Sequence, residues 1–205
     1  MKIRAIGISI FFATMIVNWA YSQKVAPVSL GAQQIDQLKA GTLLIKLNTQ
    51  SARIKHRLDN SQKSKAKSLM DEMEKEQNEI INAFKDHYTF SDYYFFYSDD
   101  SDKVLKERKF DTLFKEKGNP ITDIPTLTNT FLLVLGVAPG YSTVDKYKFV
   151  LHQLTADGLS PIDKTMPKVF KTQSRKLFSN KYDFPNSVIR MVERLEKFHL
   201  KVHEQ

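Results

Sequence analysis

The alternation of hydrophobic and polar residues predicts four strands in this chain. The runs that fit a strand are Thr42–Leu47, Tyr93–Tyr97, Phe131–Leu135 and Lys146–Leu154. In the first three runs apolar side chains occupy both faces, which is typical of a strand covered on two sides. In the fourth run the apolar residues alternate with Lys146, Lys148 and His152, so we predict an edge strand with one face in water.

Helical periodicity fills the segments around these strands. The predicted helices are Ala32–Ala40, the segment from about Lys103 to Phe114, and a last helix from near Pro185 to the C-terminus. Gly41 follows the first of them and predicts a glycine C′ residue that ends it. In the last helix an apolar stripe recurs at spacings of three and four, which predicts docking on a sheet. Its members are Val188, Val192, Leu195, Phe198 and Val202.

Charge divides the helical segment 49–88 into two pieces. Ser51–Lys67 carries six cations and one anion, whereas Ser68–Lys85 carries five anions and two cations. One continuous helix would place cations at its positive end and anions at its negative end, against the helix dipole. We therefore predict a helical hairpin with a break at Asp59-Asn60-Ser61, and Ser68-x-x-Asp71 as a capping box that starts the acidic helix.

Together these elements predict an α/β fold with a single mixed sheet flanked by helices. The hairpin is an insertion in this fold, and the C-terminal amphipathic helix packs on the sheet. Residues 23–205 contain no internal repeat or low-complexity tract, so we expect one domain there. The element order resembles a thioredoxin-like core, but the Cys-x-x-Cys motif of that family is absent and Thr130, not proline, precedes Phe131. The resemblance therefore implies an order of elements and no redox activity.

Residues 1–22 have the features of a cleaved signal peptide. Met1–Arg4 carries two cations, an apolar run extends to Trp19, and Ala20 and Ser22 place small side chains before a cut ahead of Gln23. The apolar run is short for a membrane span. We expect export to the periplasm or the medium, with no transmembrane anchor after cleavage. The stretch from GTLLIKL to YYFFYSDDSD also resembles uncharacterised exported bacterial proteins, over about a third of the chain, and implies no activity.

Composition excludes several classes of function. The 205 residues include no cysteine, which removes thiol catalysis, zinc–thiolate sites and iron–sulfur clusters. Neither GxGxxG nor GxxxxGK[ST] occurs, and there is no GxSxG or HExxH motif. We therefore expect no cofactor.

Three carboxylates, Asp99, Asp100 and Asp102, directly follow the strand Tyr93–Tyr97. Ligands of open α/β sheets bind beyond the carboxyl ends of the strands, and carboxylates bind Mg²⁺ or Ca²⁺. This pattern indicates a metal site for a metal-dependent hydrolase. The alternative, which we favour, is that Ser98, Asp99 or Asp100 caps the next helix.

The histidines offer one further metal candidate. His199 and His203 lie four apart on the last helix, with Glu196 one turn earlier, and that spacing can chelate a transition metal. Without a carboxylate from another element the pair is incomplete, and we favour a role in satisfying the terminal carbonyl groups of the helix. His56, His87 and His152 are isolated in the sequence.

Charge is segregated along the chain, whose formal net charge is +8. Two basic segments, Ser51–Lys67 and Asp163–Gln205, each sum to +5, whereas Ser68–Asp102 sums to −8. A basic face would attract anionic envelope components weakly. The segments lack the interleaved aromatic residues of nucleic-acid grooves, so no specific nucleic-acid recognition is expected. Pairing of the opposite charges with each other is the alternative that we favour.

These observations predict an exported, non-redox binding or accessory protein of unknown ligand, more readily than an enzyme. The alternative is a metal-dependent hydrolase that uses the carboxylates after YYFFYS.

Overall fold

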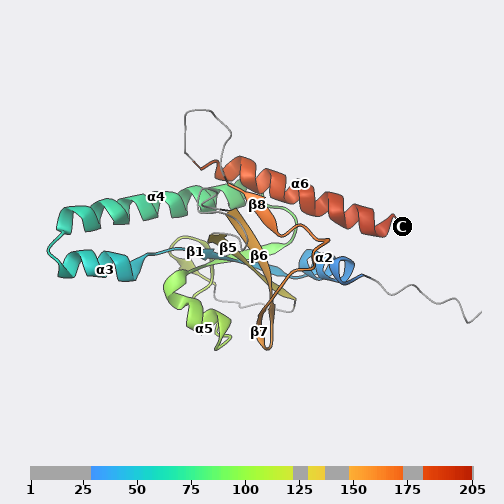
Figure 1. Cartoon of the computed structure of the whole chain (residues 1–205), viewed down its shortest axis with the longest axis horizontal. Coiled ribbons are helices and arrows are strands. Elements are labelled where there is room, and N and C mark those ends of the chain that lie inside the picture. The colour runs from blue at the N-terminus through green and yellow to red at the C-terminus, as the bar shows by residue number, and fades with distance from the viewer. Residues whose placement is uncertain (1–28, 122–128, 137–147, 173–181, 205) are drawn as a thin grey trace, which may run out of the picture.

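The computed structural model of the chain describes residues 29–121, 129–136, 148–172 and 182–204. Within these residues the chain forms one mixed eight-stranded sheet with five α-helices packed against it, which confirms the predicted α/β fold (Figure 1). The predicted signal peptide lies outside the described residues, and so do Lys146 and Tyr147 at the start of the fourth predicted strand. None of the described helices is long and apolar enough to cross a membrane.

The centre of the sheet consists of three parallel strands. β1 (Thr42–Leu47) lies between β2 (Asp92–Tyr97) and β5 (Thr130–Gly136) and runs parallel to both. Leu43 and Ile45 contribute to a large core on one face, and Leu44 contributes to a smaller core on the other. All three strands were predicted, and their burial on two sides explains why both of their faces are apolar.

Antiparallel strands extend the sheet on both sides. β3 (Phe114–Glu116) and β4 (Asn119–Pro120) follow β2, whereas β6 (Lys148–Thr155), β7 (Gly158–Ser160) and β8 (Val169–Lys171) follow β5. The strand order is β4-β3-β2-β1-β5-β6-β7, with β8 also paired to β6.

The prediction that Lys146–Leu154 is an edge strand with one wet face is wrong. β6 pairs with β5 on one side and with β7 and β8 on the other, and Lys148 is only 4% exposed. The reason is that β7 and β8, two strands that the sequence pattern does not predict, cover the edge of β6 that faces away from β5.

The prediction of a helix from about Lys103 to Phe114 is also wrong, because the helix that forms there is much shorter. A 3₁₀ turn, η1 (Ser98–Asp100), leads into α5 (Ser101–Leu105), and Phe114 already belongs to β3. Residues 106–109 are all charged and give a longer helix no apolar side chain to bury. Because most helix stability in proteins comes from packing of an apolar face, the helix ends there.

The predicted hairpin is confirmed as α3 (Ser51–Asp59) and α4 (Lys63–His87). The capping box is wrong, because Ser68 lies inside α4. The cations in the first turn of α4 oppose its dipole, a cost of about 0.3–1 kcal/mol each for exposed charges. Burial of Ala66 and Leu69, at 0% and 7% exposed, extends the helix in spite of that cost.

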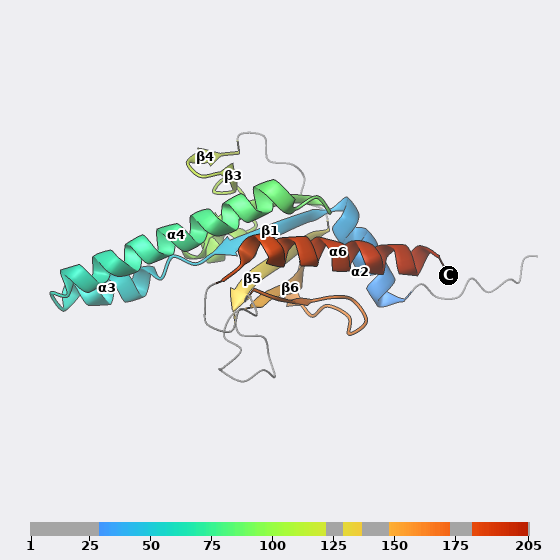
Figure 2. The same ribbon diagram turned by 90° about the horizontal axis from the view of Figure 1, so that it is seen from above.

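Two long helices cover the same face of the sheet. The C-terminal half of α4 and α6 (Phe184–His203) lie next to each other on it (Figure 2), and the apolar stripe predicted for the last helix buries Val188, Val192 and Leu195 there. The Asp183 side chain accepts a hydrogen bond from the Asn186 amide and begins α6 near the predicted position.

The first helix, α2 (Leu30–Ala40), ends at Gly41 as predicted, but not for the predicted reason. Gly41 has φ −109° and ψ −151°, which is extended and not left-handed. A Cβ atom at this position would clash with the backbone carbonyl oxygens of Gln37 and Asn129. Close approach of two backbone segments therefore requires glycine here.

Candidate functional site

The carboxyl ends of β1, β2 and β5 open at one edge of the sheet, where ligands of α/β folds usually bind. The α3–α4 hairpin leaves the sheet at this edge and extends away from it (Figures 1 and 2). Asp99 and Asp100 lie there too, as expected, and line a pocket of about 370 Å³ together with Thr49 and Glu74.

The three predicted carboxylates have separate roles. Asp99 accepts hydrogen bonds from the hydroxyl groups of Thr49 and Ser51, at 2.7 and 2.6 Å. Asp102 forms an exposed ion pair with Lys106, at 2.9 Å. Asp100 precedes α5, but its side chain makes no capping hydrogen bond. The capping interpretation is therefore wrong for the helix that follows, because Asp99 binds the start of α3 instead.

Among the described residues, the only three side chains that bring potential metal-ligand atoms together are Asp36, His199 and His203. The structure does not bring Asp99, Asp100 and Asp102 together in this way. The metal-dependent hydrolase remains a prediction without a ligand cluster to support it.

A second pocket, of about 340 Å³, lies between the hairpin and the ends of β1 and β5. Arg53, Arg57 and Lys65 line it, and so do Glu72 and Glu76 of α4. Burial raises the pKa of Glu76, and the nearby Glu79 adds to the increase. The basic and acidic segments thus line the same pocket, so the first basic segment does not form a purely cationic surface here.

A third pocket, of about 330 Å³, lies between β6, β8 and α6. Four cationic side chains line this pocket, and we therefore call it the cationic pocket. They are Lys148, Lys171, Arg190 and Arg194. The other described residues that line it are Val169, Phe170 and Ser187, so none of its described lining residues is acidic. Lys171, Arg190 and Arg194 belong to the second basic segment, Asp163–Gln205. Lys148 belongs to β6, the strand for which one solvent-exposed face was predicted.

Strand register and helix periodicity place these four cations next to one another. Lys148 and Lys171 are paired across the β6–β8 ladder, and Arg190 and Arg194 lie four apart on α6. The Arg194 guanidinium donates a hydrogen bond to the Val169 carbonyl oxygen at 3.0 Å, and it lies 5.2 Å from the centroid of the Phe170 ring. Backbone register, helix periodicity and an aromatic support therefore all position positive charge at one place.

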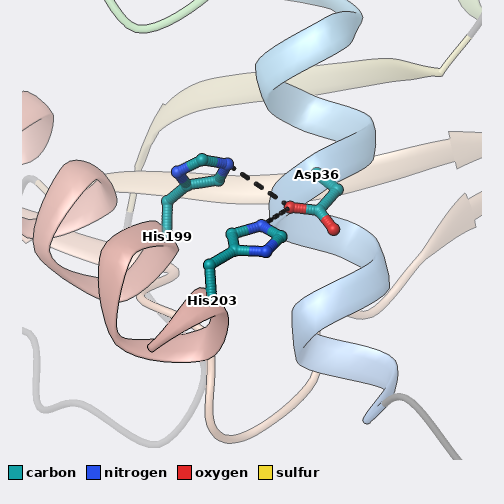
Figure 3. Close-up of side chains that lie close together, drawn as sticks. All are labelled: Asp36, His199 and His203. Atoms are coloured by element: carbon teal, nitrogen blue, oxygen red, sulfur yellow. Dashed lines mark hydrogen bonds and ion pairs between the residues drawn. The ribbon is translucent and has the colours of Figure 1, made fainter. Parts of the chain in front are cut away.

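A carboxylate from another helix lies beside the two histidines of the last helix, although the sequence does not indicate it (Figure 3). Asp36 of α2 directs Oδ1 toward both imidazoles, at 2.8 Å from His203 Nε2 and 3.4 Å from His199 Nε2. Glu196, which precedes them by one turn, is not part of this group. Among the remaining histidines, His56 contacts Asn60, and partial burial lowers the pKa of His152.

Comparison of the chain with family models, with curated proteins and with solved structures found no match. The expected resemblances to a thioredoxin-like core and to exported bacterial proteins therefore remain predictions.

Proposed function

We propose that the protein is an exported, non-redox binding protein that holds an anionic group of its ligand at the cationic pocket. The observation that carries the proposal is that four cations, and no carboxylate among the described residues, line one pocket. Guanidinium groups bind phosphate and carboxylate through two parallel hydrogen bonds, and lysine adds a point charge. The ligand class is thus a compact phosphate- or carboxylate-bearing molecule.

Repulsion within the pocket supports this assignment. Like charges directly opposite each other across a ladder are destabilising, and this is the relation of Lys148 to Lys171. Like charges four apart on a helix are destabilising too, and this is the relation of Arg190 to Arg194. A bound anion would relieve both repulsions at once.

The cationic pocket is a better anion site than the pocket at the hairpin. Glu72 and Glu76 line the latter and would repel an anion, whereas the described lining of the cationic pocket holds only cations, a hydroxyl and apolar groups. Lys148 is almost fully buried at 4% exposed, so its charge is screened less by salt than a surface charge.

The test is a thermal-shift titration of the full chain with inorganic phosphate, pyrophosphate and citrate at low and high salt. We expect pyrophosphate and citrate to raise Tm more than phosphate does, and the effect to weaken as salt increases. The double variant Lys171→Gln/Arg190→Gln should lose the response and, without ligand, be at least as stable as wild type. Lys197→Gln, an exposed cation of α6 outside the pocket, is the matched control.

A wild-type protein that responds to none of the three anions contradicts the proposal, as does an equal response in the double variant. Vesicles that contain anionic lipid distinguish the source of the anionic group. Binding to vesicles without a response to soluble pyrophosphate indicates a membrane surface, whereas the reverse indicates a small soluble ligand.

A further inference from the structure

We infer that Asp36, His199 and His203 form a binding site for a divalent transition-metal ion that connects α2 to the C-terminal end of α6. This inference is independent of the cationic pocket. Two imidazole nitrogens and one carboxylate oxygen are ligands that suit Zn²⁺, Cu²⁺ and Ni²⁺. Zinc commonly takes three protein ligands and leaves a fourth position to water.

One of the distances between the ligand atoms already fits a tetrahedral ion, and a second is close to it. The three atoms lie within 4.8 Å of one another. With metal–ligand bonds of about 2.0–2.1 Å, two ligands of a tetrahedral zinc lie about 3.3–3.4 Å apart. The separation of 3.4 Å between His199 Nε2 and Asp36 Oδ1 already has this value. The 2.8 Å separation at His203 must lengthen by about half an ångström, a small movement for a side chain in the last turn of a helix.

The first two ligands are held in place by the fold. Asp36 lies between Ile35 and Leu38 on α2, and both of these are completely buried. The His199 ring packs edge-on against Phe90, with 6.2 Å between the centroids, and Phe90 is 1% exposed. Preorganised ligands lose little freedom when they bind an ion, which favours affinity.

The third ligand leaves the site accessible. The side chains of His203 and Asp36 are 53% and 43% exposed, whereas that of His199 is 28% exposed. An ion and its water ligand can therefore reach the Oδ1 atom that both imidazoles face (Figure 3). Because the ion binds α2 and α6 together, we expect it to stabilise the folded chain.

The decisive experiment titrates the full, metal-free chain without a histidine tag with Zn²⁺ against a chromophoric chelator. We expect one equivalent to bind. Asp36→Asn and His203→Gln, which preserve side-chain shape, should each lower the affinity by more than about tenfold, since even outer-shell partners of a metal site are worth 10–100-fold. His56→Gln and His87→Gln, which remove histidines outside the group, should bind Zn²⁺ as wild type does.

The role of the carboxylate separates this site from simple chelation by two histidines on one helix. Wild-type affinity in Asp36→Asn overturns the inter-helix site, and so does the absence of stoichiometric binding by the wild-type chain. A second readout does not depend on variants. Zn²⁺ should shift the imidazole proton resonances of His199 and His203 and leave those of His56 and His87 unchanged, and the opposite pattern contradicts the inference.

Discussion

Asp99 accepts a hydrogen bond from the hydroxyl group of Ser51, at 2.6 Å between Oδ2 and Oγ, although 48 residues separate the two in sequence. Ser51 is the first residue of α3, so the carboxylate lies at the positive end of that helix. The other oxygen of Asp99 accepts a hydrogen bond from Thr49. Asp99 therefore links the end of β2 to the start of the helical hairpin.

Replacement of Asp99 by alanine should destabilise the chain by about 1–2 kcal/mol, because it removes two charge-assisted hydrogen bonds and a favourable charge at a helix N-terminus. Asp100→Ala is the matched control, since the Asp100 side chain makes no capping hydrogen bond and its loss should change stability by less than about 0.5 kcal/mol. Urea denaturation measures both values. Equal effects of the two substitutions would show that the link to Ser51 has no energetic importance.

Gly41→Ala should destabilise the chain by about 3 kcal/mol, because two backbone segments would have to separate to admit the methyl group. The Asn129 carbonyl oxygen that it would strike also accepts a hydrogen bond from the Thr42 amide, at 3.4 Å, so a displacement disturbs the start of β1. Gly136→Ala is the control, because its nearest neighbour is a Val134 methyl group at 3.9 Å. If thermal melts show Gly41→Ala to be as stable as its control, the proposed close approach is wrong.

Glu76→Gln should stabilise the chain at neutral pH. Burial raises the pKa of Glu76 in the folded state, so the ionised form is less favourable there than in the unfolded chain. This penalty is complete above the folded-state pKa and disappears as the pH falls toward the ordinary carboxyl value. The advantage of the variant, measured by denaturation at a series of pH values, should therefore shrink on acidification. A stability gain of Glu76→Gln that is independent of pH, or that increases as the pH falls, would contradict this prediction. Glu72→Gln, an exposed position on the same helix, is the control.

The central strands were predictable because β1, β2 and β5 are buried on both faces, and such strands carry apolar residues on both faces. The edge assignment of β6 failed because alternation reports on the two faces of a strand and carries no information about its neighbours. β8 has only three residues, Val169–Lys171, which is too short for a pattern. α4 begins earlier than its charge pattern predicts, because burial of Ala66 and Leu69 outweighs the unfavourable interaction of the cations with the helix dipole.

The candidate sites were less predictable than the fold. Sequence spacing relates residues within one element, so it predicted that His199 and His203 share one helix face. It gave no sign that Asp36 would meet the histidines across 167 residues, a contact set by the packing of α2 on α6. The pairing of Lys148 with Lys171 depends on the β6–β8 register, which likewise has no signature in the sequence.

The most direct test of the anion-binding proposal maps the amide resonances of the isotope-labelled chain during a titration with pyrophosphate. We expect the largest shifts in β8, at Val169–Lys171, and in the part of α6 from Ser187 to Arg194. They should be absent in Lys171→Gln/Arg190→Gln. Shifts that are largest in the hairpin, at Ser51–Lys67, or a spectrum that pyrophosphate leaves unchanged, would contradict it.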